Sequence, residues 1–305
     1  MNAPARLAAV ALGLVAVFGA AVGVGSLVGP VGTVGTAAAA SPAEGHGDDG
    51  HESAPAEPPA TSLPAGLAVA ADGYTLELGT PTAPAGPATE VRFRVLGPDG
   101  APVTAFEVAH EQDLHLVAVR RDLSGFQHVH PERVEDGVWR ATLGLTPGAW
   151  RLFADFVPAA DGENRVLGAD LSVPGGYAPE PLPAPSAVAE VDGYTVVLTG
   201  DLVPGRESEL TLSVSRDGRP VTDLQPYLGS YGHLVVLRSG DLGYLHVHPA
   251  DGPAGAAPAP GPHVGVLTTA PTAGTYRVFL DFRHGDAVHT AAFTVTTTAP
   301  EEAGS

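Results

Sequence analysis

The sequence predicts an all-β protein built from two tandem β-sandwich domains, and three observations support this. The chain repeats itself: DGYTLEL at Asp72 returns as DGYTVVL at Asp192. The apolar runs in both copies are short, rich in Val, Leu, Tyr and Phe, and separated by DG, PG and AG pairs, as in strands joined by turns. The hydrophobic fraction of 44% is normal for a globular protein despite 39 Gly and 30 Pro. We therefore expect folded β domains joined by Pro- and Gly-rich linkers.

The N-terminal segment, residues 1–40, carries an export signal. Arg6 precedes an apolar stretch that starts at Leu7, and its length of about 20 residues suits a membrane-spanning helix. Ala38, Ala39 and Ala40 before Ser41 form a small-residue pattern typical of signal-peptidase cleavage. A cleaved signal peptide and a retained membrane anchor both fit. In either case we expect the rest of the chain to lie outside the cytoplasm, secreted or anchored by this helix.

Residues 41–66 predict a disordered linker of Pro, Ala, Gly and acidic residues. It contains HGDDGHE, from His46 to Glu52, which could hold a metal only loosely because a flexible peptide must first be ordered.

The two repeats span residues 67–176 and 190–298. Further matches define them: GPDGAPVT with SRDGRPVT, HLVAVRRDLSGFQHVHP with HLVVLRSGDLGYLHVHP, and PGAWRLFADF with AGTYRVFLDF. The Pro-rich residues 177–189 between them predict an extended linker, and 299–305 a tail. Roughly seven strands per copy, with Trp150 or Tyr276 two residues after a Gly at the start of a late strand, suit an immunoglobulin-like sandwich. A closed barrel of similar strand number remains open.

Charge and composition exclude several functions. The chain has 34 acidic and 15 basic residues, a net charge of −19, which repels nucleic acids and anionic membrane surfaces. Cysteine is absent, so thiolate catalysis and Cys-based zinc sites are excluded.

Six of the 12 histidines occupy equivalent positions in the two repeats: His115, His128 and His130, then His233, His246 and His248. In each copy the first His begins an apolar run, a turn follows, and a second run ends in His-Val-His-Pro. If residues 121–124 form a four-residue turn, His115 lies opposite His130, with His128 on the same face. Three imidazoles from adjacent strands can form a three-His metal site. The sequence therefore predicts one such site in each repeat.

Carboxylates could complete these sites. Asp155 and Asp281, both preceding a Phe in matching strands, are candidates for a fourth ligand or for orienting a ligand imidazole; solvation at a strand end is the alternative. His110 and Glu111 could add ligands in the first repeat, but Leu228 and Gly229 stand at the corresponding positions of the second.

A structural role for the histidines, hydrogen-bonded within the sheet, is the alternative to metal binding. Both faces of the predicted hairpin are apolar, so the sequence does not show which face is buried. All six His are kept between copies while their neighbours differ, and this favours metal. With Met1 the only Met and no Cys, imidazole ligands suit Cu(II) or Zn(II) rather than Cu(I).

The HLVVLR, HVHP and GTYRVFLDF elements resemble exported or anchored two-repeat proteins of high-GC Gram-positive bacteria, a resemblance covering nearly the whole chain. More loosely, the repeats resemble periplasmic copper-resistance β-sandwich proteins, although this chain lacks their Met-rich segment. These resemblances imply the fold, the compartment and, for the second group, copper binding through the six His. We therefore expect an extracytoplasmic metal-binding protein for metal homeostasis or resistance, its partners being the metal ion and an envelope or membrane protein that the sequence does not identify.

Two other functions remain open. One is a metal-free immunoglobulin-like adhesion or interaction module. The other is a cupin-like metalloenzyme, because Glu132 follows His130, but Ala250 stands at that position in the second copy. No Gly-x-Ser-x-Gly elbow or phosphate-binding Gly loop occurs, so we expect no enzymatic activity.

Overall fold

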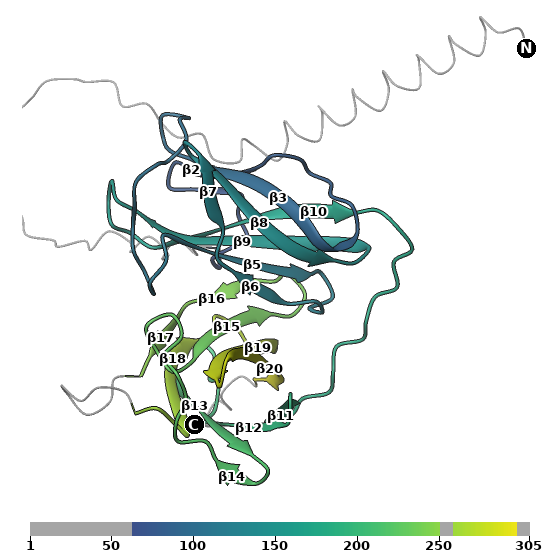
Figure 1. The fold of residues 1–305 in the computed structure, drawn as a ribbon, viewed down its shortest axis with the longest axis vertical. Helices are drawn as coiled ribbons and strands as arrows, with labels where there is room; N and C mark the ends of the chain where they lie inside the picture. Colours follow the sequence, from purple (N-terminus) through teal and green to yellow (C-terminus); the bar gives the residue numbers. More distant parts are fainter. Residues whose placement is uncertain (1–62, 251–258, 298–305) are drawn as a thin grey trace, which may run out of the picture. The chain divides into compact units, whose positions relative to one another are not determined.

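The computed structural model describes residues 63–250 and 259–297, which form an all-β structure with four antiparallel sheets, two in each repeat (Figure 1). The two sheets of each repeat share a hydrophobic core, which makes each repeat a β-sandwich. The expected signal or anchor at 1–40, most of the linker that follows, and the tail lie outside the described residues. Within the described ranges no helix has the length and apolarity needed to span a membrane.

The first repeat contains strands β1 to β10. One sheet has the order β1-β2-β3-β8-β7 and the other β10-β9-β5-β6, with β4 paired to β9. The bounds are β1 Ala70–Ala71, β2 Tyr74–Leu78, β3 Gly86–Leu96, β4 Phe106–Glu107, β5 Leu114–Arg120, β6 Gln127–Val129, β7 Glu132–Glu135, β8 Val138–Leu145, β9 Gly148–Pro158 and β10 Arg165–Val173.

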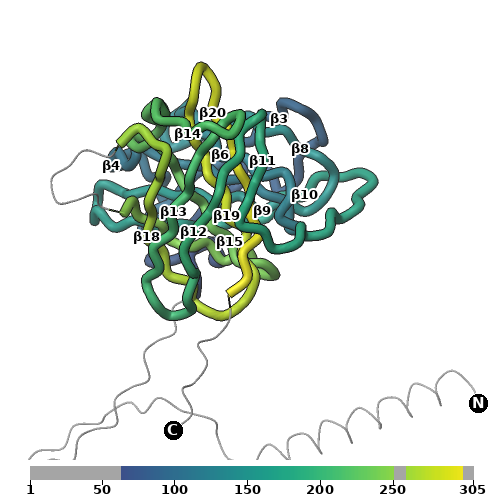
Figure 2. The backbone as a smooth tube through the Cα atoms, turned by 90° about the horizontal axis from the view of Figure 1, so that it is seen from below, coloured from purple at the N-terminus to yellow at the C-terminus, as the bar shows by residue number. Residues whose placement is uncertain are grey.

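The second repeat contains strands β11 to β20. Figure 2 shows β11, β12, β13 and β18 side by side in a sheet of order β11-β12-β13-β18-β17, with β14 paired to β13; the other sheet has the order β16-β15-β19-β20. The bounds are β11 Val188–Val191, β12 Tyr194–Thr199, β13 Glu207–Arg216, β14 Arg219–Pro220, β15 His233–Arg238, β16 Tyr244–Leu245, β17 Val247–Pro249, β18 His263–Thr269, β19 Thr275–His284 and β20 Ala287–Thr296.

Strand β5 is buried on both faces, unlike strand β3 of the other sheet of the first repeat. In β3, Val91, Phe93 and Val95 are buried while the residues between them are exposed, the alternation expected of a sheet with one face in water. In β5 all seven residues are buried. One face, which includes Leu116, packs into the core of its own sandwich. The opposite face must therefore be covered by something outside that sandwich.

The second repeat covers this outer face. Val117 and Val119 of β5 belong to a third hydrophobic cluster that also contains Val235 and Leu237 of β15. The cluster further includes Leu123, Phe153, Val166, Leu242, Tyr244 and Phe279. Phe126 of the first repeat stacks on Phe279, with ring centroids 3.9 Å apart and planes 7° apart. The apolar character of both faces of the hairpin is thus explained by one sandwich core and one contact between repeats.

The segment that precedes the first repeat is hydrogen-bonded to both repeats beside this contact. Gly66, in the segment that the sequence assigns to a linker, donates a backbone hydrogen bond to Val166 O of the first repeat. The carbonyl of Ala65 accepts one from Tyr244 N of the second. Hydrogen bonds to both repeats thus hold this short segment in place.

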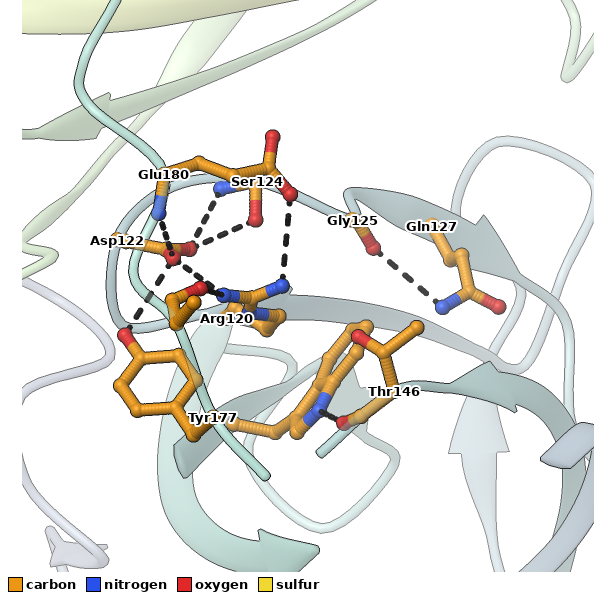
Figure 3. Close-up of polar contacts among 10 residues, drawn as sticks. Arg120, Asp122, Ser124, Gly125, Gln127, Thr146, Tyr177 and Glu180 are labelled. Carbon is orange, nitrogen blue, oxygen red and sulfur yellow. Dashed lines mark hydrogen bonds and ion pairs between the residues drawn. The ribbon is translucent and has the colours of Figure 1, made fainter. Parts of the chain in front are cut away.

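The inter-repeat linker is attached to the turn after β5 (Figure 3). Arg120 pairs with Asp122 at 2.6 Å, both side chains being 8% exposed, and donates to the carbonyl of Ala178. Asp122 accepts hydrogen bonds from the backbone N–H of Glu180 and from the Tyr177 hydroxyl. The first part of the linker is therefore anchored to the first repeat.

Replacing Phe279 by Ala should test the contact between the repeats. Truncation of a buried Phe leaves a cavity and lowers the free energy of unfolding by about 3–5 kcal/mol. Phe279 is 3% exposed, whereas Val288 on β20 is 43% exposed, so V288A should change stability by at most about 0.5 kcal/mol. Chemical denaturation measures both. Equal stability of the two variants would show that the Phe279 contact does not form in solution.

Candidate metal centre between the repeats

The β5–β6 hairpin places its histidines as its register predicts. Leu116 pairs with Val129, Val117 with His128 and Ala118 with Gln127, and Arg120 N donates to Ser124 O across the turn. The predicted register is therefore confirmed over these three pairs, whereas at the turn Arg120 bonds to Ser124 and not to Gly125, the partner that a turn over residues 121–124 predicts. Because side chains alternate along a strand, His115 and His128 lie on the face of Val117, which is the face that meets the second repeat.

The second repeat begins the same hairpin but does not complete it. Val236 pairs with Leu245 and Leu237 with Tyr244, and then the chain crosses to the opposite sheet, where Val247–Pro249 pairs with β18. In the first repeat the equivalent crossing comes after Pro131, because β7 begins at Glu132. The earlier crossing takes His246 and His248 away from His233. The structure thus differs from the expectation of a three-His set in each repeat.

The histidines that come together belong to different repeats. One ring nitrogen from each of His115, His128 and His233 lies within 4.8 Å of the other two, and among the residues described this is the group of ligand-type side chains that meets this condition. The rings of His115 and His233 stack with centroids 5.5 Å apart, and that of His233 lies 4.9 Å from that of His128. We call these three residues the three-His centre.

His130 lies beside this centre without belonging to it. Its ring centroid is 5.1 Å from that of His115 and 5.2 Å from that of His128. Its Nε2 is buried and has no hydrogen-bond partner. The expected ligand is thus adjacent to the centre, with a nitrogen that no protein group satisfies.

Hydrogen bonds determine which nitrogens of the centre carry protons. His115 Nε2 is 3.0 Å from Ala109 O, and a carbonyl only accepts, so Nε2 carries the proton. His128 Nδ1 is 2.9 Å from Asp281 Oδ2, so it donates to the carboxylate. In the neutral rings, His115 Nδ1 and His128 Nε2 therefore both present lone pairs. These two atoms face each other at 3.1 Å.

Two lone pairs at this distance repel each other. A metal ion between them would relieve the repulsion, and so would a proton, whose charge the Asp281 carboxylate beside His128 would balance. With metal–nitrogen bonds of 2.0–2.1 Å, two imidazole nitrogens lie about 3.4 Å apart in a tetrahedral site and about 2.9 Å apart at a right angle. The observed 3.1 Å lies between these values.

Burial favours the metal-binding form of these imidazoles. Desolvation lowers the pKa of His115 to about 3, that of His233 to about 2 and that of His130 to about 4. A neutral imidazole is the form that binds metal. The rings are therefore ready to act as ligands at neutral pH without losing a proton.

Each aspartate lies near a histidine of the other repeat. Asp281 accepts hydrogen bonds from His128 and, at 2.6 Å, from the Thr290 hydroxyl, and the side chains of His128 and Asp281 are 1% and 4% exposed. Burial raises the pKa of the Asp155 carboxyl, while Asn164, which donates a 2.7 Å hydrogen bond, and the nearby His246 act against this. Each aspartate also lies directly opposite the first His of its own repeat, Asp155 opposite His115 and Asp281 opposite His233, which agrees with the sequence's placement of both carboxylates beside these histidines.

Two contributors to the centre were not expected from the sequence. Ala109 supplies a backbone carbonyl, which carries no sequence signal. His110, considered only for the first repeat's own site, places its ring 5.2 Å from His233. It sits with Glu111 in a tight turn in which both residues have positive φ, as do Leu228 and Gly229 in the second repeat. One sequence signal could have indicated a site between the repeats. The face of the β5–β6 hairpin that carries Val117 and Val119 is apolar although it points away from its own sandwich core.

Residues 68–175 and 189–299 match the family described as a domain of unknown function, DUF8832. The chain belongs to this family. Both DUF8832 repeats thus coincide with the two sandwiches that form the three-His centre. No curated protein matches the chain.

Several solved structures are distantly similar to this chain. The Escherichia coli adhesin FdeC is 19% identical with a TM-score of 0.25, covering 76% of this chain and 66% of its own. The Yersinia pseudotuberculosis adhesin InvE is 16% identical with a TM-score of 0.23, covering 74% and 59%. The fibronectin(III)-like modules of Clostridium thermocellum CbhA are 12% identical with a TM-score of 0.20, covering 76% and 98%. The chain thus spans less than two thirds of the two adhesin structures.

The lowered pKa values predict a pH-dependent stability of the metal-free protein. Above about pH 6.5 the imidazoles are neutral in both folded and unfolded chains. Below it the unfolded chain binds protons that buried His115 and His233 do not accept until pH falls to about 3 or 2, so the unfolding free energy decreases as pH falls. The slope is at most about 1.4 kcal/mol per pH unit for each residue.

The double variant H115Q/H233Q should therefore show a shallower decline between about pH 6 and 4, as measured by urea denaturation. The control H263Q removes an exposed histidine of β18 and should keep the wild-type slope. The same slope in the double variant and in wild type would mean that these imidazoles are solvated.

Proposed function

We propose that the protein binds one Cu(II) or Zn(II) ion between its two repeats, through His115, His128 and His233, and that it serves metal homeostasis or resistance outside the cytoplasm. One observation carries the proposal: His115 Nδ1 and His128 Nε2 face each other at 3.1 Å while their other nitrogens are engaged. Imidazole ligands suit both metals.

Alternative occupants of the space between the two nitrogens are less favourable. A proton between His115 and His128, whose charge the Asp281 carboxylate would balance, satisfies only these two rings. A metal ion satisfies both lone pairs at once and can use His233 as a third ligand. The export signal and the absence of a recognisable catalytic motif support binding outside the cytoplasm rather than catalysis.

The metal-free protein, freed of chelator and titrated with Cu(II) or Zn(II), should bind one ion tightly per chain. A site in each repeat would instead give two. H128Q should abolish tight binding, because Gln removes the ligand nitrogen while its amide can still donate to Asp281. H284Q changes a histidine bonded to Tyr194 and Asp223, outside the three-His centre, and should keep the ion. Elemental analysis and calorimetry give the stoichiometry. Absence of a tight ion from wild type would leave the metal-free interaction module as the better account.

Asp281 should tune the affinity of the centre. Loss of a carboxylate that orients a ligand imidazole typically costs 10–100-fold in metal affinity. D281N should therefore weaken Zn(II) binding by about 10–100-fold. D192N is the matched control, because Asp192 accepts a hydrogen bond from His289, outside the three-His centre, and it should keep the wild-type affinity. Equal affinities for D281N and wild type would show that Asp281 does not support a ligand.

A further inference from the structure

A cavity of about 480 Å³ lies directly beside the three-His centre. His115 and His233 form part of its wall, so the centre borders this space. The same wall includes His110, Asp155, Glu209, His246 and His248. The two exposed histidines that the early strand crossing carried away from His233 therefore still face the same space as the buried rings.

The polar groups of this cavity suit a cation. The wall carries imidazoles and the carboxyl groups of Asp155 and Glu209, and the lining drawn from residues 63–250 and 259–297 includes no arginine. The sequence has no lysine at all. Anionic ligands would meet no opposite charge here, whereas a divalent cation meets both ligand types that it prefers.

His246 and His248 form a second pair of donors in this cavity. Their ring centroids are 4.7 Å apart and both residues are exposed. Asp155 is close enough to His246 for each to influence the ionisation of the other. By contrast, His115 of the three-His centre, which also lines the cavity, is only 5% exposed. Donors in contact with water and donors shielded from it thus face a single space.

A buried metal site needs a route by which the hydrated ion enters and loses its water. We propose that His246, His248 and Asp155 form a loading site that first binds the hydrated metal ion and passes it through the cavity to the three-His centre. This inference rests on the proposed function. The exposed donors replace part of the hydration shell, and the buried imidazoles then exchange for the remaining ligands. In this exchange of ligands only the ion carries charge from the loading site to the three-His centre.

The break in the symmetry of the repeats fits this division of roles. His128 and His246 are equivalent in sequence, and each lies near an aspartate of the opposite repeat, Asp281 and Asp155 respectively. The first pair is sealed, whereas the second pair lies where β17 has joined the sheet edge. One copy of the motif thus retains the ion and the other receives it.

Stopped-flow mixing of the metal-free full chain with Cu(II), followed by ligand-field absorption, tests this inference. In wild type the loading rate should saturate with Cu(II) concentration, because binding at the loading site precedes transfer. H246A/H248A should load about tenfold more slowly or worse at low Cu(II), since the local ion concentration is lost. At equilibrium, H246A/H248A should still bind one Cu(II) ion per chain, with the same affinity as wild type. D155N should slow loading in the same direction, and H284Q should load like wild type.

The outcomes separate the two proposals. Wild-type loading rates in H246A/H248A would overturn the loading site while leaving the three-His centre intact. Complete loss of the tight ion in that variant would also overturn it, by making the pair part of the final site. If H128Q takes up Cu(II) as fully as wild type, the three-His centre is not the destination, and both proposals fail.

Discussion

Burial of the outer faces of β5 and β15 against each other is the contact on which the rest of the structure depends. Val117, Val119, Val235 and Leu237 bring the two hairpins together, and His115 and His233 follow at the end of the same strand faces. Because side chains alternate along each strand, the apolar contact decides which rings meet. The histidine cluster is thus a continuation of a hydrophobic interface, and separation of the repeats would dismantle it.

Two copies of one motif have acquired different environments through a small change in strand pairing. The segment His-Val-His-Pro continues along β5 in the first repeat, but in the second it moves to β18 after Leu245. His128 is thereby sealed beside Asp281, whereas His246 remains in water. We therefore propose that one copy of the motif retains the ion and that the other gives it access.

The sequence predicted the repeats, the all-β class and the register of the β5–β6 hairpin, because these follow from local signals: self-similarity, turn residues and alternation. It could not predict the partnership of His233 with His115, since that depends on how two sandwiches pack. Nor could it predict the crossing after Leu245, because the residues around it match those of the first repeat. The contribution of Ala109 is a backbone carbonyl and leaves no trace in composition. The expectation of two equivalent sites followed from assuming that equal motifs have equal surroundings.

Anomalous X-ray scattering from crystals of the Cu(II)- or Zn(II)-loaded protein tests the central claim most directly, because it locates the ion rather than counting it. We expect one strong peak between the repeats, about 2.0–2.2 Å from nitrogens of His115, His128 and His233. A principal peak on His246 and His248, peaks within each repeat separately, or no ordered peak near His128 would contradict it.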